Sequence, residues 1–449
     1  MQSAPSKSTQ ASLATEAVSL PGLSLRRNFS WTLAGNVVYA GCQWGMLVVL
    51  AKLGSPVMVG QFALGLAVTA PVIMFSNLQL RAVQATDARG EYLFSDYLGL
   101  RLIMIVLALL VILGFAFISG YRWETALVVM VVGLAKAFES VSDVFYGLLQ
   151  KHERMDRIAK SMMIKGPLSL VALGAGVYLT GSVLWGAIGL AIIWALILVG
   201  YDVRSGAFIL RNILQAPGST ITKSKDLAVV LWPRWQTETL RKLTWLAMPL
   251  GIAMMLISLN TNIPRYFIEH YLGERELGIF AAMAYLMVAG NTVVSALGQS
   301  ASPRLARYFA SGDSKAFCNL LLKLLGIGAL LGSLSVLIAL LAGRELLTII
   351  YRPEYASYMN VFFWLMVASG VSYIASFLGY GMTAARYFKV QLILNVIFSA
   401  VMVGTSAVLI PSHGLLGAAW AIFTVFILQL PVKGLAMVYA LKNCKAVRN

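Results

Sequence analysis

Charged residues are scarce in this sequence. Only 12% of its 449 residues are Asp, Glu, Lys or Arg, whereas soluble domains carry about 25%. Hydrophobic residues make up 59% of the chain, and the mean hydropathy is +0.79. Lipid is therefore the expected solvent. We expect an all-α polytopic membrane protein, because a helix satisfies its own backbone hydrogen bonds where no water is present.

Cysteine and histidine are also scarce, with 3 residues of each. The cysteines at 42, 318 and 444 are isolated from one another, which excludes a disulfide framework and a metal-ligand pattern. The chain has no GxxxxGK[ST] loop and no HExxH motif. The composition thus favours a protein that is not an enzyme, holds no metal or cofactor, and does not drive transport with ATP by itself.

Long uncharged intervals indicate the membrane spans, each of which needs about 20 residues. The interval 166–201 is long enough to fold back, and we expect it to do so at Thr180-Gly181-Ser182. The interval 390–432 is expected to fold back at Pro411-Ser412-His413-Gly414. With one charged span at 124–150, the sequence predicts twelve helices. The other uncharged intervals are 28–51, 53–80, 102–121, 243–264, 277–303, 324–343 and 355–385.

The placement of lysine and arginine predicts the orientation of the spans. Basic residues favour cytoplasmic loops, and the alternate segments that begin with the N-terminus hold nearly all of them. The opposite loops hold only Lys52, Arg122, Arg265, Arg275, Arg344 and Arg352. We therefore predict that both termini are cytoplasmic. Topology accounts for most of the net charge of +17, so this charge does not indicate a nucleic-acid partner.

Short motifs recur in order along the two halves of the chain. Gly60-Gln61-Phe62-Ala63 returns as Gly278-Ile279-Phe280-Ala281, Tyr146-Gly147 as Tyr380-Gly381, and Gly186-Ala187 as Gly417-Ala418. Equal halves of six spans predict two bundles related by a pseudo-two-fold axis along the membrane normal, with a central site. The expected divisions are a disordered cytoplasmic tail at 1–24, bundles at 25–203 and 243–441, a cytoplasmic linker at 204–242, and a tail at 442–449.

One predicted span carries three charged residues on one helical face. Lys136, Glu139 and Asp143 are separated by three and four residues. Counted from Glu124 at 1.5 Å per residue, Lys136 lies roughly 18 Å deep, close to the middle of the hydrocarbon. A charge there costs at least a few kcal/mol (roughly 2.5–3.5 on insertion scales) unless it meets a partner or water. We therefore expect this span to carry a water-exposed polar face with a role in function.

Three stretches resemble the polysaccharide-export branch of the multidrug/oligosaccharidyl-lipid/polysaccharide exporter superfamily, the Wzx-type flippases. They are residues 80–101 (LRAVQATDARGEYLFSDYLGLR), residues 136–165 with Tyr146-Gly147 and Gln150, and residues 260–280 (NTNIPRYFIEHYLGERELGIF). The resemblance covers about residues 25–440. It implies two six-helix bundles around a cavity, and export of undecaprenyl-diphosphate-linked oligosaccharide across the bacterial inner membrane.

The chain departs from two relatives of that branch. Lipid II flippases carry arginines within their first two helices, where this sequence has Asn36, Gln43, Gln61, Asn77 and Gln79, with Arg81 only at the exit. Drug/cation antiporters often carry an acid in the first helix, and none occurs here between Arg27 and Lys52. The first departure disfavours a strongly cationic cavity, and the second disfavours drug antiport.

A flippase breaks no covalent bond, so its candidate residues bind rather than react. It needs hydrogen-bonding groups, cations for a diphosphate, and aromatic surfaces for sugars. Alternatives stay open: Lys136 can neutralise Glu139, Asp143 can pair with Lys136, Arg101 or Lys165, and Arg265 can extend to the interface. The substrate-binding candidates are Lys136, Glu139, Asn36, Gln43, Arg81, Asn262 and Arg265, and the candidates for H⁺ or Na⁺ coupling are Glu139 and Asp143.

The sequence therefore predicts a lipid-linked oligosaccharide flippase, involved in O-antigen or exopolysaccharide synthesis, that works by alternating access. Its expected partners are the lipid-linked oligosaccharide, membrane lipid, and glycan polymerase or ligase machinery. A cation-coupled multidrug or small-molecule exporter of the same fold is the alternative. A third hypothesis is a scaffold for glycan-assembly enzymes that transports nothing.

Overall fold

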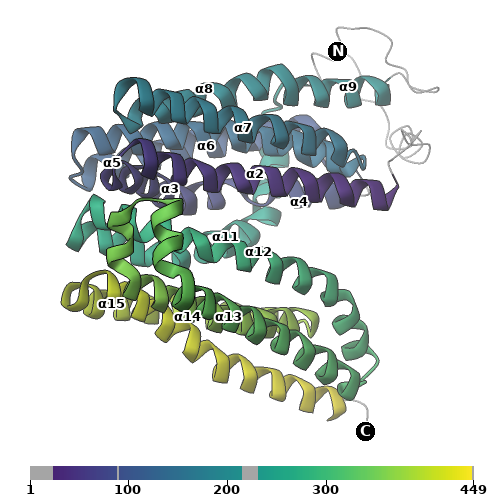
Figure 1. Ribbon diagram of the computed structural model, residues 1–449. Coiled ribbons are helices and arrows are strands. Elements are labelled where there is room, and N and C mark those ends of the chain that lie inside the picture. The colour runs from purple at the N-terminus through teal and green to yellow at the C-terminus, as the bar shows by residue number, and fades with distance from the viewer. Residues whose placement is uncertain (1–23, 88–89, 215–230, 447–449) are drawn as a thin grey trace, which may run out of the picture. The chain divides into compact units, whose positions relative to one another are not determined.

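The computed structural model of the protein describes residues 24–87, 90–214 and 231–446, and these residues form helices without strands (Figure 1). In this described part, 11 helices are long and apolar enough to cross a membrane. The protein is thus an all-helical, multi-pass membrane protein, as the composition predicts. Large apolar side chains such as Leu110, Ile118 and Leu179 remain exposed on the helices, which is what a lipid-facing surface requires.

Most helices extend beyond the uncharged intervals, because charged residues at a membrane edge continue the helix into the interface. The first part of the chain forms α2 (Leu25–Leu53), α3 (Pro56–Asn77), α4 (Leu80–Thr86), α5 (Phe94–Ile118), α6 (Trp123–Lys151), α7 (Met155–Thr180), α8 (Val183–Ile197), a π-helix (Leu198–Asp202) and α9 (Val203–Leu214). The second part forms α11 (Thr237–Leu272), α12 (Glu274–Ala310), α13 (Ser314–Ile350), a 3₁₀-helix (Pro353–Tyr358), α14 (Met359–Ala384) and α15 (Phe388–Ala446).

The chain divides into two compact units. Unit 1 comprises Met1–Val49 and Val68–Met255, and unit 2 comprises Leu50–Ala67 and Leu256–Asn449. Helices α2, α3 and α11 contribute to both. Of the segment predicted as a linker, residues 204–214 lie in α9 and residues 237–242 in α11. Residues 215–230, and the predicted tails at 1–23 and 447–449, lie outside the described residues.

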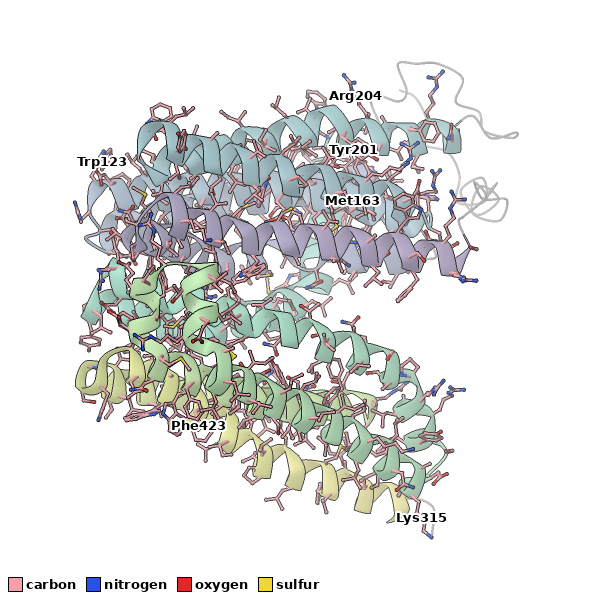
Figure 2. The ribbon with its side chains drawn as sticks, in the orientation of Figure 1. Trp123, Met163, Tyr201, Arg204, Lys315 and Phe423 are labelled. Carbon is pink, nitrogen blue, oxygen red and sulfur yellow. The ribbon has the colours of Figure 1, made fainter. Side chains whose placement is uncertain are left out.

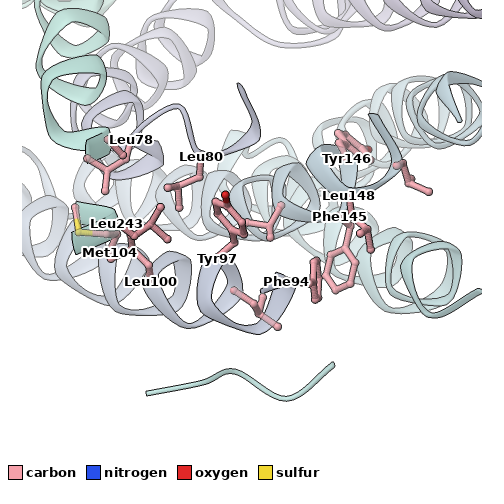
Figure 3. Packing of buried hydrophobic residues seen from close by; sticks show 14 of the residues in the cluster. Leu78, Leu80, Phe94, Tyr97, Leu100, Met104, Phe145, Tyr146, Leu148 and Leu243 are labelled. Atoms are coloured by element: carbon pink, nitrogen blue, oxygen red, sulfur yellow. The ribbon is translucent and has the colours of Figure 1, made fainter. Parts of the chain in front are cut away.

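The core of unit 1 gathers buried apolar side chains from α4, α5, α6, α7, the π-helix, α9 and α11, part of which Figure 3 shows. Phe94 of α5 packs against Phe145 of α6 with ring centroids 5.1 Å apart. Leu78, Leu80 and Leu243 are fully buried in the same cluster. Dense packing of this kind fixes α5 and α6 against each other, and α6 is the helix that carries the charged stripe.

Both predicted chain reversals have counterparts in the structure. Helix α7 ends at Thr180, Gly181 takes the left-handed conformation with φ 67°, and α8 begins at Val183. This is the usual glycine termination of a helix. Helix α15 is broken at Gly414, where φ is 59° and ψ −139°. Side chains from before and after the break share one apolar cluster, in which Phe398 and Met402 join Val425.

A close helix crossing in unit 2 joins two of the repeated motifs. Gly60 of α3 lies against the backbone of α12 at Glu274 and Gly278, and Gly278 lies against the backbone of α3 at Pro56 and Gly60. A β-carbon at either position would overlap a backbone carbonyl of the other helix. Glycine at both positions is therefore required for the backbones to approach this closely.

Candidate functional site

The charged stripe predicted on residues 136–143 lies along α6, inside unit 1. The side chains of Lys136, Glu139 and Asp143 are 23%, 29% and 27% exposed. They are neither sealed in the core nor spread over an outer surface. With their partners Tyr39, Arg81 and Arg101 we call this group the α6 polar face.

The first part of the α6 polar face is a neutralised pair with aromatic neighbours. Lys136 Nζ lies 2.8 Å from Glu139 Oε2, and the Tyr39 hydroxyl donates to Glu139 Oε1 at 2.5 Å. The same ammonium lies 4.9 Å from the centre of the Trp194 ring. The pairing of Lys136 with Glu139 that the sequence allows is therefore present. A cation over an aromatic face, beside a tyrosine hydroxyl, also suits sugar and anion contacts.

The second part of the α6 polar face is organised by Asp143. Its carboxylate lies 3.6 Å from Arg81 and 3.3 Å from Arg101, so of the three predicted partners Arg101 is the one it meets. Arg101 is fully buried and also hydrogen-bonds Asn77. Arg81 is 31% exposed and donates to Gln150 Oε1 at 2.9 Å. Two arginines on one aspartate leave this part with net positive charge.

A break between α3 and α4 places Arg81 in this group. Leu78 and Gln79 have φ values of 48° and 51°, a conformation that residues other than glycine seldom adopt. Leu78 is fully buried, and this packing holds the break in place. The short helix α4 then presents Arg81 to α6, with the guanidinium 5.6 Å from the centre of the Tyr146 ring.

A buried ion pair lies behind the α6 polar face, and sequence reasoning did not single it out. Lys165 of α7 is 3.6 Å from Asp202, and both side chains are almost completely buried. Ser161 donates to Asp202 at 2.6 Å, and Lys165 donates to Ser142 and Tyr146 at 3.2 Å each. The π-helix at Leu198–Asp202 delivers the aspartate. The signal was present in the sequence, because Asp202 closes an uncharged interval that Lys165 opens.

The remaining predicted residues fall in different places. Gln43 lies one turn after Tyr39 on α2, partly buried, while Asn36 is exposed on the same helix. In unit 2, Arg265 donates to the Asn262 side chain at 3.1 Å, and Asn262 donates to the Ser258 carbonyl at 2.9 Å. Unit 1 thus brings together Lys136, Glu139, Asp143 and Arg81, whereas Asn262 and Arg265 form a separate pair in unit 2.

Known structures share this fold. The lipid II flippase MurJ in an inward closed conformation matches with a TM-score of 0.66 at 12% identity, over 93% of this chain and 87% of that chain. An inward-facing multidrug resistance MATE family transporter of the MOP superfamily matches with a TM-score of 0.62 at 14% identity, over 98% and 99% of the two chains. The protein is thus a multi-pass helical membrane protein with the fold of these two proteins.

The sequence matches the polysaccharide biosynthesis protein family over residues 25–309, and the chain belongs to that family. It is 28% identical over 402 residues to the capsular polysaccharide biosynthesis protein CapF of Staphylococcus aureus, covering 88% of this chain and 95% of the relative. The resemblance seen in the sequence is therefore confirmed at the level of the family.

Proposed function

We propose that the protein moves an oligosaccharide linked to undecaprenyl diphosphate across the bacterial inner membrane by alternating access. The family supports a role in polysaccharide synthesis, and the relative from Staphylococcus aureus supports a capsule-type product. The fold, shared with a lipid II flippase and a multidrug transporter, supports transport rather than catalysis. The carrier would then pass its cargo to polymerase or ligase machinery without breaking a covalent bond.

Two structural features support twelve spans with internal symmetry. The break at Gly414 divides an apolar helical stretch of 52 residues, Val390–Leu441, which at 1.5 Å per residue is roughly twice what one span needs. Counting its two parts separately gives twelve spans. The reciprocal packing of Gly60 and Gly278 is the contact that a two-fold axis between repeated motifs produces. An even number of spans agrees with two cytoplasmic termini.

The observation that carries the proposal is the α6 polar face. Lys136, Arg81 and Arg101 outnumber Glu139 and Asp143 by one positive charge. Lys136 and Arg81 are the accessible cations, and each already has a carboxylate partner. A diphosphate can therefore bind by forming ion pairs with Lys136 and Arg81 in competition with the carboxylates. It is released when the pairs with Glu139 and Asp143 form again. Tyr39 and Tyr146 border this route with hydroxyl groups and rings suited to sugars.

Deleting the gene from its host tests the function directly. We expect lipid-linked oligosaccharide to accumulate in the inner leaflet and to be depleted from the outer leaflet. A plasmid copy should reverse the accumulation, and a copy with Lys136→Ala should not. If deletion leaves the lipid-linked glycan unchanged and only raises sensitivity to toxic cations, the protein is a multidrug exporter and the proposal is wrong.

A further inference from the structure

Unit 2 contains a buried lysine that sequence analysis did not use. Lys433 lies in the part of α15 after the break at Gly414, and its residue is only 8% exposed. Its ammonium donates to Gln429 Oε1 at 2.6 Å and to the Ala375 carbonyl at 3.4 Å. Lys433 lies inside the apolar stretch Val390–Leu441, directly after the uncharged interval 390–432.

No carboxylate balances this lysine among the residues that the structure describes. Lys433 forms hydrogen bonds only to neutral groups, and no ion pair within 4 Å includes it. Gln429, which accepts from it, is itself buried. An ammonium held in a low-dielectric interior without a counter-charge is unfavourable. An ionisable side chain inside a membrane segment is usually part of a binding site or an ion path.

A glycine lies beside Lys433 and leaves room there for a methyl group. A β-carbon on Gly379 of α14 would lie 4.0 Å from Lys433 Nζ and 3.6 Å from Gln391 Nε2. The Gln391 amide donates to the Gly379 carbonyl at 3.4 Å, and Thr383 donates to Gln391 Oε1 at 3.2 Å. We call Lys433, Gln429, Gln391 and Gly379 the Lys433 cluster. It offers one cation and amide donors, which are groups that bind an anion.

The internal repeat strengthens this reading of Lys433. The offset that aligns Gly186-Ala187 with Gly417-Ala418 is 231 residues, and the same offset aligns Asp202 with Lys433. Both halves thus bury a charge at the aligned position, with opposite signs. In unit 1 the charge is compensated internally, by Lys165. In unit 2 no carboxylate of the described residues pairs with the lysine, which leaves an anionic ligand as a candidate partner.

We propose that the Lys433 cluster binds the phosphate group of a lipid head. Lysine binds phosphate as a point charge, and amide groups complete the contact. Lys433 is eight residues, roughly 12 Å, from the end of its apolar helix at Leu441, so a head group at the membrane surface has a short path to it. One candidate ligand is the diphosphate of the lipid-linked cargo, and this assignment rests on the proposed function. The phosphate of an anionic phospholipid is the other source.

Binding to the purified full-length protein tests this proposal. The protein is placed in phosphatidylcholine nanodiscs, and native mass spectrometry and competition titration measure binding of two probes, farnesyl diphosphate and phosphatidylglycerol. We expect Lys433→Met to weaken binding by about tenfold or more, since a charged hydrogen bond is lost. Lys433→Arg should stay close to wild type. Lys323→Met, on an exposed position of α13 in the same unit, is the matched control and should change nothing.

Two further measurements keep the test decisive if Lys433→Met folds poorly. Gly379→Ala adds a methyl group at van der Waals distance from Lys433 and Gln391, so the unfolding temperature should be retained while probe affinity falls. Thermal unfolding of Lys433→Met without probe should show no loss of stability, because an uncompensated buried charge has been removed. A lower unfolding temperature would show that the lysine is structural and would overturn the proposal.

The two probes separate the sources of phosphate. Lys433-dependent binding of farnesyl diphosphate alone supports the cargo diphosphate, and binding of both probes supports a phospholipid head group at the same site. Equal binding by wild type and Lys433→Met, or no binding by wild type, refutes the site. That failure leaves the proposed function intact if gene deletion still causes lipid-linked oligosaccharide to accumulate in the inner leaflet.

Discussion

Gly60 and Gly278 contact each other reciprocally in unit 2. Gly60 meets the carbonyl of Glu274, four residues before Gly278, and Gly278 meets the carbonyl of Pro56, four residues before Gly60. Each glycine opens one copy of a repeated four-residue motif. This reciprocal packing is the contact expected of the proposed two-fold relation between the repeats.

The first prediction concerns this crossing. Gly278→Ala should lower the free energy of unfolding by about 1–3 kcal/mol or more, because the added methyl group overlaps a backbone carbonyl that cannot move alone. Thermal unfolding in detergent measures the effect. Gly404→Ala on α15 is the matched control, since open space surrounds that position, and it should be neutral or slightly stabilising. Equal effects of the two substitutions would contradict the close packing.

The second prediction separates ion pairing from substrate binding at Lys136. Lys136→Met alone should destabilise the protein by about 1–3 kcal/mol, because Glu139 loses its charged partner. The double variant Lys136→Met/Glu139→Gln should recover most of that stability, since Tyr39 still has an acceptor. Transport of lipid-linked oligosaccharide should stay below about a tenth of wild type in both variants, by the loss of a charged contact. A double variant that transports normally would make Lys136 a purely structural residue.

The third prediction concerns the buried pair Lys165–Asp202. Lys165→Met should cost about 3–5 kcal/mol of stability, because the aspartate is left charged and uncompensated. Replacing both residues, as Lys165→Met/Asp202→Leu, should restore most of the loss. Thermal unfolding of the single and double variants gives the coupling energy directly. Additive effects of the two substitutions would argue against the pair.

The fourth prediction concerns energy coupling. If Glu139 carries the coupled ion, Glu139→Gln in proteoliposomes should abolish stimulation of transport by a proton or sodium gradient and leave downhill exchange in place. Asp143→Asn should act less specifically, because it releases Arg81 and Arg101 together. Glu238→Gln, on an exposed residue, is the control. Gradient stimulation that survives Glu139→Gln would place the coupling elsewhere.

Features set by local sequence could be predicted, and those set by distant partners could not. The reversals at Gly181 and Gly414 follow from span length and glycine chemistry. The pair Lys136–Glu139 follows from helical spacing. The partner of Lys165 is 37 positions away in the chain and depends on a π turn, whose presence one sequence does not indicate. Lys433 was missed because it ends an uncharged interval and so looked interfacial.

The π turn at Leu198–Asp202 also fixes the angular phase of everything that follows it in the span. A turn of this kind holds one residue more than an α turn, so each later side chain lies about 100° behind the position it would have in an uninterrupted α-helix. Asp202 thereby faces inward, while Arg204, labelled in Figure 2, is exposed. Deleting one residue of this turn, for example Val199, should convert it into an α turn and leave Asp202 facing Lys165. The π turn is therefore the place where this span accommodates one residue more than a regular α-helix would hold.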